Sequence, residues 1–388
     1  MSTRTIPLSE ALIEVSSGVG PAWTRYRVLG ATRAGLALAK EPVGKAPERY
    51  KLVEPGTIFY NPMRILIGSI AMLDDGEEPG ITSPDYVVVR TRPGVLHHRW
   101  FYHWLRSEQG AEMIRSLARG AVRERLLFKR LARGSITIPD WDSQVRAADK
   151  LAIIQKARAV AAAQLEAAKA LPAAYLREVF ESQEARKWPV RRLGDTGNIT
   201  SGITLGRKLN SSATQQRPYL RVANVKDGYL DLSSVLTTPV TGEDIEKLTL
   251  QKGDLLLTEG GDPDKLGRGT VWNEEITGCL HQNHIFRVRF PATAVFPEFA
   301  AFQAGSSYGK RYFLAHAKRT TGIATINQRV LSAFPLLLPP LGVQIDVARG
   351  IASKLATCNR LLKLTDGNQK SVGALPSSIM QQAFGKQV

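Results

Sequence analysis

The sequence predicts an α+β protein. We expect two strand-rich domains, separated by two long antiparallel helices that form a coiled coil, in an internal repeat with pseudo-twofold symmetry. Two observations predict this fold: the string LPAAYLREVF at 171–180 returns as LPSSIMQQAF at 375–384, and short apolar runs followed by a long helical pattern precede each string. A phrase repeated at about half the chain length indicates an internal duplication. The predicted boundaries are 1–140 (first domain), 141–183 (first long helix), 184–338 (second domain) and 339–388 (second long helix).

Further pairs of segments recur in the same order along the two halves. They are ITIPDWDSQ (136–144) with LLLPPLGVQ (336–344), VEPGTIFYN (53–61) with LQKGDLLLT (250–258), GSIA (68–71) with GTVW (269–272), and VVVR (87–90) with FRVR (286–289). At the front, VLGATRAGL (28–36) is aligned with RLGDTGNITSGI (192–203). This front alignment gives the second copy a longer segment before its KGDLLL strand.

Each copy begins with a strand-rich part. Short apolar runs such as DYVVVR and DLLLTEG are separated by Gly, Pro, Asn and Asp, which is typical of strands joined by turns. One helix is predicted after these strands in each copy, at 97–118 and at 297–317. A short apolar strand that ends at proline, SITIP or PLLLPP, follows each helix.

A long helix closes each copy. Between Gln144 and Leu171 the chain has no Gly or Pro, and alanine, the best helix former, dominates. Alternate spacings of four and three predict a coiled-coil seam with a polar break at Arg158. The alternative is two ordinary core helices, each buried against its own domain. The seam positions are Ala147, Leu151, Ile154, Arg158, Ala161, Leu165 and Ala168, then Ala348, Ile351, Leu355, Cys358, Leu362, Thr365, Gln369 and Val372.

The charge favours a polyanionic partner. Lys and Arg total 52 against 35 Asp and Glu, a net charge of +17. An evenly solvated basic surface is the alternative, but the cations cluster between Glu112 and Arg133. We expect nucleic acid rather than a membrane, because no basic segment has a strong lipid-facing stripe.

The length of the predicted long helices also suits DNA. A helix of roughly 28 residues is about 42 Å long, close to the ~34–36 Å between DNA half-sites on one face of the duplex.

Other classes are disfavoured by composition. No apolar run approaches the ~18 residues of a membrane span, and the N-terminus lacks the pattern of a secretory signal. The only cysteines, Cys279 and Cys358, have no metal-like spacing, so a reducing cytoplasm is the expected compartment.

Several motifs resemble those of type I restriction–modification specificity subunits. They are FYNPMRILIGSIA (59–71), PYLRVANVKDGYLDL (218–232), LQKGDLLLTEGG (250–261), HQNHIFRVR (281–289) and TTGIATINQRVLSAFPLLLPPLGVQ (320–344). The resemblance implies two target-recognition domains, each reading one half of an asymmetric, bipartite DNA target. It also implies partners: two methyltransferase subunits docked on the helices and a restriction (translocase) subunit. S-adenosylmethionine, ATP and Mg²⁺ would then belong to the partners, with no cofactor in this chain. The first domain departs from the pattern, because it lacks a counterpart of YLRVANV.

Candidate catalytic motifs are weak. NPMR (61–64) has Met63 and Arg64 where a base-gripping methyltransferase tetrapeptide needs a proline and an aromatic residue. The acids Asp254, Glu259, Asp262 and Asp264 could be a metal-dependent nuclease cluster, but a strand ending in a tight turn explains them better. His281 and His284 lack two further ligands at zinc spacing. We therefore expect a non-catalytic chain with no catalytic, cofactor or metal residues.

Residues for DNA contact are chosen by chemistry. Arg and Lys bind phosphates or guanine edges, and Asn suits adenine. In the first domain these are Asn61, Arg64, Arg119, Arg123 and Arg125; in the second they are Lys208, Arg217, Asn224, Lys226, Lys265, Arg268, Lys318, Arg319 and Thr321. Three alternatives stay open: the specificity subunit of a methylation-only or other restriction system, a stand-alone metal-dependent nuclease, and a structural coiled-coil scaffold.

Overall fold

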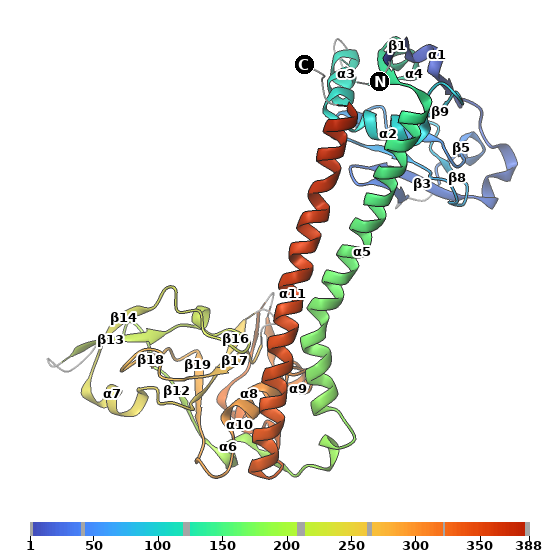
Figure 1. The fold of residues 1–388 in the computed structure, drawn as a ribbon. Coiled ribbons are helices and arrows are strands. Elements are labelled where there is room, and N and C mark those ends of the chain that lie inside the picture. Colours follow the sequence, from blue (N-terminus) through green and yellow to red (C-terminus); the bar gives the residue numbers. More distant parts are fainter. Residues whose placement is uncertain are drawn as a thin grey trace. The chain divides into compact units, whose positions relative to one another are not determined.

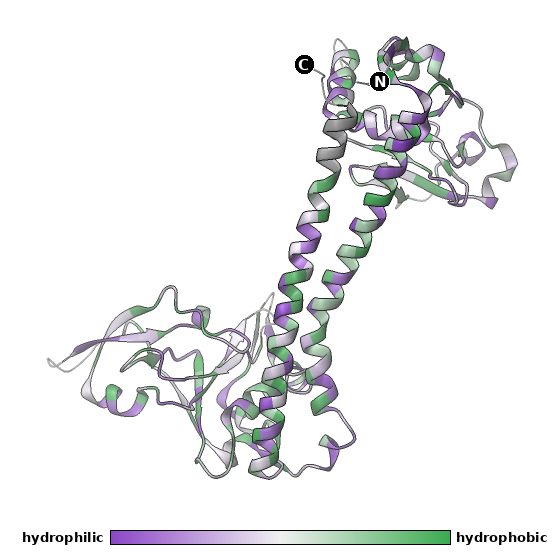
Figure 2. Cartoon of the chain, viewed as in Figure 1, coloured by the Kyte–Doolittle hydropathy of each residue, from purple (hydrophilic) through white to green (hydrophobic). Residues whose placement is uncertain are grey.

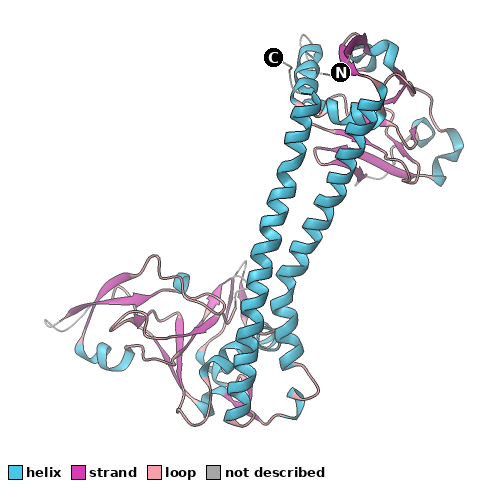
Figure 3. Cartoon of the chain, in the orientation of Figure 1, coloured by secondary structure: helices cyan, strands magenta, loops and turns pink. Residues whose placement is uncertain are grey.

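The computed structural model describes residues 3–39, 43–118, 125–207, 214–261, 266–320 and 323–384. The chain forms two compact units, each with strands and helices (Figures 1 and 3). Unit 1 comprises Met1–Ala163 and Gly367–Val388, and unit 2 comprises Gln164–Asp366. Two long helices contribute to both units: α5 (Trp141–Phe180) and α11 (Leu341–Phe384).

Unit 1 has two four-stranded sheets and a separate strand pair. The first sheet has the order β2 (Leu12–Glu14), β9 (Val87–Thr91), β6 (Ile58–Tyr60), β7 (Ile70–Met72). The second has the order β4 (Gly35–Leu38), β3 (Arg27–Thr32), β8 (Gly80–Thr82), β5 (Lys51–Val53), with β3 and β8 parallel. The pair is β1 (Thr3–Pro7) with β10 (Ser135–Pro139), antiparallel.

Short helices join and cover these strands. They are α1 (Leu8–Ala11), α2 (His98–Leu105), α3 (Glu108–Ala118) and α4 (Phe128–Leu131), with 3₁₀ turns η1 (Gly20–Arg25), η2 (Pro47–Arg49) and η3 (Ile65–Ile67). The largest core cluster joins apolar residues of β6 and β9 to Trp100 and Phe101 of α2 and to Ala148 and Leu151 of α5. The start of the long helix is therefore part of the core of unit 1.

Unit 2 has strands β11 (Val190–Arg192), β12 (Asn198–Ser201), β13 (Gln215–Leu220), β14 (Leu236–Val240), β15 (Leu255–Thr258), β16 (Gly260–Gly261), β17 (Gly269–Val271), β18 (Leu280–His281), β19 (Ile285–Arg289), β20 (Lys318–Thr320), β21 (Ile323–Thr325) and β22 (Pro335–Leu337). Its short helices are α6 (Leu193–Thr196), α7 (Gly242–Leu248), α8 (Pro297–Gly305), α9 (Ser307–His316) and α10 (Gln328–Ser332), with 3₁₀ turns η4 (Ala185–Lys187) and η5 (Val222–Asn224).

The strand order of unit 1 recurs in unit 2. The sheet β12-β19-β15-β17 corresponds to β2-β9-β6-β7, and β14-β13-β18 corresponds to β4-β3-β8. The pairs β13–β18 and β3–β8 are both parallel. The antiparallel pair β11–β22 matches β1–β10. The two units therefore have matching folds, as expected from the duplication in the sequence.

A buried glutamine makes the same three hydrogen bonds in each unit. Gln144 accepts from the backbone N of His97 (2.9 Å) and donates to the carbonyls of Val95 (3.2 Å) and Pro139 (3.0 Å). In unit 2, Gln344 accepts from Phe296 N (2.9 Å) and donates to Ala294 O (3.2 Å) and Pro339 O (2.8 Å). Each glutamine joins the first turn of a long helix to the strand before it and to the start of α2 or α8, which explains why ITIPDWDSQ and LLLPPLGVQ align.

Most seam positions of the long helices are buried or half-buried. In α5, Leu151, Ile154, Ala161, Leu165 and Ala168 are buried, and only Arg158 of the predicted seam is exposed. Every predicted seam position of α11 is buried or half-buried. In unit 2, residues of both helices share one cluster, which includes Phe180, Ala348 and Ile351. Figure 2 shows polar and apolar residues alternating along both helices. The antiparallel coiled coil as a spacer between domains stays a prediction.

Two predictions need correction. The segment 97–118 is two helices, because Ser107 Oγ donates to Trp104 O and accepts from Gly110 N, which ends one helix and starts the next; Ser306 does the same in unit 2. The front alignment of 28–36 with 192–203 is wrong. Leu193 N donates to Phe334 O as Leu8 N donates to Gly134 O, so 192–203 corresponds to the segment that begins at Leu8.

Among the helices of the described residues, none combines the length and the apolar composition that a membrane crossing needs.

Candidate nucleic-acid interface

Unit 1 contains a groove that brings three of the predicted DNA-contact residues together. The groove has a volume of about 930 Å³ and lies beside β3 and β4. Asn61 and Arg64 line it from the turn between β6 and β7, and Arg125 lines it from the segment before α4. Arg64 and Arg125 are exposed. Arg119 and Arg123 lie outside the described residues.

Local hydrogen bonds fix the turn between β6 and β7, residues 61–69. Asn61 Oδ1 accepts from Met63 N (2.9 Å), and Asn61 N donates to Ser69 O (3.3 Å). Gly68 has a φ of 83°, the left-handed conformation that favours glycine. Ile65 is only 3% exposed and anchors the turn to the core. Asn61 therefore shapes this turn in addition to lining the groove.

A backbone hydrogen bond joins two of the segments that line the groove. Leu126 N donates to Pro62 O at 3.1 Å, which places the segment 125–129 against the 61–69 turn. Lys129 lines the groove next to Arg125 and is exposed. It was not among the predicted contact residues, although it lies in the same run of cations between Glu112 and Arg133.

The groove is basic overall. Besides Arg64, Arg125 and Lys129, its lining includes Lys51 and the exposed acids Glu14 and Asp85. Lys51 Nζ donates to Tyr86 O at 2.7 Å, and partial burial lowers its pKa. The cations thus outnumber the acids, which suits a polyanion.

Unit 2 repeats the contact between these two segments. Ile326 N donates to Glu259 O at 2.8 Å, the counterpart of the bond from Leu126 N to Pro62 O. Thr258 N donates to Arg268 O (2.8 Å), so Arg268 lies at the end of the same strand pair. Lys318 and Arg319 are exposed on β20, which pairs with β21, and β21 also pairs with Gly260 and Gly261.

The loop after β13 adds a further predicted cation to this region. Gly228 N donates to Gly269 O at 2.9 Å, which places the loop of Lys226 next to the strand that follows Arg268. Lys226 is half-buried. Three other predicted residues, Lys208, Lys265 and Thr321, lie outside the described residues. Of those that are described, the structure brings together Lys226, Arg268, Lys318 and Arg319 around the end of β15.

Two other predicted residues are placed differently. Asn224 is 3% exposed; its amide donates to Asp231 O and Ser234 O, and its Oδ1 accepts from Arg221 N. It holds the loop, and its side chain does not reach the surface. Arg217 lies at the start of β13, at the other end of the strand from the Lys226 loop, and donates to Gln215 Oε1 (2.9 Å).

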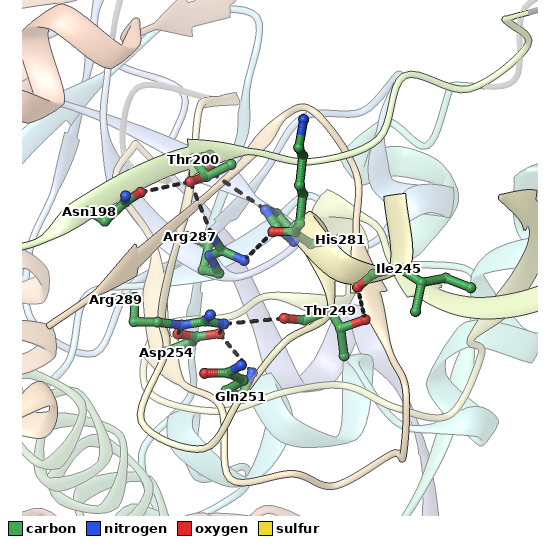
Figure 4. A network of polar contacts seen from close by, with 10 residues as sticks. Asn198, Thr200, Ile245, Thr249, Gln251, Asp254, His281, Arg287 and Arg289 are labelled. Atoms are coloured by element: carbon green, nitrogen blue, oxygen red, sulfur yellow. Dashed lines mark hydrogen bonds and ion pairs between the residues drawn. The ribbon is translucent and has the colours of Figure 1, made fainter. Parts of the chain in front are cut away.

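The acids considered for a nuclease do not converge in the described part of unit 2. Asp254, 1% exposed, accepts two hydrogen bonds of 2.7 Å from Arg289, whose Nη2 also donates to Thr249 O, as Figure 4 shows. Glu259 instead pairs with His284 at 2.6 Å. Asp262 and Asp264 lie outside the described residues. Asp254 is thus a structural partner of Arg289.

His281 belongs to a buried polar network with Arg287 (Figure 4). Arg287 donates to Lys247 O (2.9 Å) and to Thr200 Oγ1 (3.1 Å), and is 5% exposed. His281 is fully buried, and burial lowers its pKa to about 4, helped by the Arg287 charge. A deeply buried imidazole beside a guanidinium is suited to packing rather than to metal binding.

One group of side chains in unit 1 has metal-ligand chemistry. Asp74, Asp75 and His98 lie close together. Arg99 already engages both carboxylates, Asp74 at 2.5 Å and Asp75 at 3.0 Å. The guanidinium supplies the positive charge that a cation would otherwise bring, so the group is explained as an ion-pair cluster.

Known proteins with similar sequences are specificity subunits. The chain is 26% identical over 168 residues to the type I restriction enzyme StySPI specificity subunit of Salmonella potsdam, covering 42% of this chain and 36% of that protein. It is 25% identical over 182 residues to the EcoKI specificity subunit of Escherichia coli K12, covering 46% and 39%. The chain thus matches well under half of the length of these relatives. No protein-family profile matches the sequence.

Solved structures agree on the fold. A chain from a study of complex assembly and conformational transition in the type I restriction–modification system has a TM-score of 0.59 at 15% identity, covering 100% of this chain and 98% of that one. Over part of its length, this chain is similar in sequence to type I restriction–modification specificity subunits. The HsdS subunit from Thermoanaerobacter tengcongensis has a TM-score of 0.53 at 16% identity, covering 100% and 97%. Both solved structures support the mixed α and β fold of this chain.

Proposed function

We propose that this chain is the DNA-sequence-specificity subunit of a type I restriction–modification complex. Each unit would bind one half of a bipartite, asymmetric target. The observation that carries the proposal is the repeated contact between the strand-end turn and the segment before α4 or α10. Cations line the groove at this contact in unit 1, and in unit 2 Lys318 and Arg319 on β20 and Arg268 just before β17 lie next to it. Basic residues near the same backbone contact in both units suit two separate contacts with one polyanion.

The asymmetry of the target would follow from side chains that differ at equivalent backbone positions. Pro62 and Glu259 accept the same backbone hydrogen bond, but one is apolar and the other is acidic. In unit 2, Glu259 is further paired with His284. Since base edges are read by the chemistry of the contacting side chains, two units built alike but lined differently would select different half-sites.

Long helices would provide the spacing and the docking surface. We infer that α5 and α11 form the predicted antiparallel coiled coil, and that two methyltransferase subunits and a restriction subunit bind the assembly. S-adenosylmethionine, ATP and Mg²⁺ would be held by those partners, and this chain would contribute recognition without catalysis. A cytoplasmic complex with host DNA is the corresponding setting.

Selection from random duplexes tests this proposal. The full chain, co-purified with its methyltransferase partner, is expected to enrich a motif of two short conserved blocks separated by a fixed spacer. Recovery of no motif at moderate salt would refute sequence recognition. A motif with one block would refute the proposal that each unit binds its own half of the target.

A second candidate, a metal-dependent nuclease acting alone, is separated by a simpler assay. Plasmid incubated with the chain and Mg²⁺, without partners, should stay intact if the proposal is correct, whereas cleavage would favour the nuclease. A methylation-only system would give the same motif, with methylated DNA and no cleavage in the complete complex.

A further inference from the structure

Unit 1 exposes an unusual set of large apolar side chains on the 61–69 turn. Met63 is 55% exposed, Leu66 is 38% exposed and Ile67 is 67% exposed. Leu127, which is 53% exposed, lies with Met63 in the lining of the groove. Single exposed apolar residues are ordinary, but a group of them on one turn marks an interaction surface.

The turn holds these side chains outward in a fixed conformation. Its ends are joined by the bond from Asn61 N to Ser69 O, and the carbonyl of Arg64 accepts from both Ile67 N (3.2 Å) and Ser69 N (3.2 Å). Ser69 Oγ donates to Ala31 O at 2.8 Å, which fastens the turn to β3. Because the backbone is already ordered, presenting Met63 and Ile67 to a partner would cost little conformational entropy.

Cations lie beside part of this apolar surface. Arg64 lies between Met63 and Ile67 on the turn, and Arg125 and Lys129 line the groove beside Leu127. Two exposed acids, Glu14 and Asp85, lie in the same lining. Exposed apolar side chains next to cations are the combination found in proteins that insert Met, Leu or Ile between base pairs and unstack them.

We propose that unit 1 inserts Met63 and Ile67 into a base step of its half-site, while Arg64, Arg125 and Lys129 bind the neighbouring phosphates. This inference rests on the proposed DNA-recognition function. In unit 2, the described residues of the equivalent segment, 258–261 and 266–268, include one large apolar residue, Leu266, and it is 1% exposed. The described residues of this segment thus present no exposed large apolar side chain, and the inference concerns the half-site of unit 1.

The experiment places 2-aminopurine at successive positions of the selected motif and measures its fluorescence, which rises when the base is unstacked. The full chain is used alone and with its methyltransferase partner, because a rise seen with the chain alone cannot come from a base flipped by the partner. The variants are the double substitution Met63→Gln/Ile67→Gln, which keeps side-chain length, and Ile13→Ala. Ile13 is a matched control, since it is an apolar residue of unit 1 that is 43% exposed on β2.

The expected result is a fluorescence rise at one step of one half-site, lost in M63Q/I67Q and kept in I13A. Affinity for the specific duplex should fall about tenfold in M63Q/I67Q, which corresponds to ~1.4 kcal/mol. Thermal melting of the variant checks that unit 1 is still folded.

Four outcomes overturn the inference. With specific binding intact, no fluorescence rise at any step, or a rise that M63Q/I67Q retains, refutes insertion and leaves the proposed function standing. Loss of methyltransferase co-purification in M63Q/I67Q, with DNA stacking unchanged, assigns the apolar surface to a protein partner instead. Absence of any sequence-specific binding by the unsubstituted chain refutes the proposed function itself, and the inference fails with it.

Discussion

Replacing Gln344 by methionine should destabilise unit 2 strongly although it conserves side-chain volume. Gln344 is 1% exposed and makes three hydrogen bonds, to Phe296 N, Ala294 O and Pro339 O. At a net ~1 kcal/mol for each bond, and with a small packing term for a shape-conserving exchange, the expected loss is about 3 kcal/mol. For a unit of this size ~1 kcal/mol lowers Tm by about 2–4 °C, so Tm should fall by about 6–12 °C.

Differential scanning calorimetry of the full chain is the assay. Gln144→Met should lower the stability of unit 1 by a similar amount, because Gln144 makes the same three bonds. Gln155→Met is the matched control, since Gln155 is exposed on α5 and the same exchange there should leave Tm nearly unchanged. A fall in Tm of less than ~2 °C for Q344M, or an equal fall for Q155M, would refute the idea that these glutamines fasten each long helix to its unit.

Three further predictions concern charge, pH and thiols. Arg64→Ala and Arg268→Ala should each weaken DNA binding and lower the slope of log K against log salt concentration by about 1; an unchanged slope in a salt titration would remove that arginine from the phosphate contacts. Burial lowers the pKa of His281 from 6.5 to about 4, so the unfolded chain binds a proton in this interval that the folded chain does not. Stability should therefore fall as pH drops from 6.5 to about 4, by up to about 3 kcal/mol, and His281→Leu should show a shallower dependence in urea titrations at several pH values; equal slopes would contradict this. Burial raises the pKa of the Cys279 thiol to about 12, so in the folded chain Ellman's reagent should react with the half-exposed Cys358 alone, and rapid reaction of both thiols would show that Cys279 is accessible.

Much of the architecture follows from local spacing in the sequence. The alternation of four and three along 147–168 and 348–372 identified the less exposed side of both long helices, because helical periodicity fixes which residues share a side. The pairs GSIA with GTVW and VVVR with FRVR identified equivalent strands, β7 with β17 and β9 with β19. These assignments depend on residues close together in the chain.

The candidate site was foreseen only in part. Arg64 and Arg125 were chosen for their chemistry, and the structure places both in one groove. The sequence could not show that the Asn224 amide donates hydrogen bonds to the carbonyls of Asp231 and Ser234. Nor could it show that the Asp254 carboxylate accepts hydrogen bonds from Arg289. A side chain that bonds within the fold has the same chemistry as one that faces a ligand, so composition cannot distinguish them.

The sequence by itself determined that the chain is duplicated, basic, and built from strand-rich parts followed by long helices, since these properties lie in periodicity, order and charge. Only the tertiary structure decided which segments are equivalent at the front of each copy and which residues meet at the end of β6 and of β15. The physical reason is that bonds such as Leu126 N to Pro62 O and Ile326 N to Glu259 O join segments far apart in the chain. Their pairing is set by the packing of whole sheets, which no local pattern encodes.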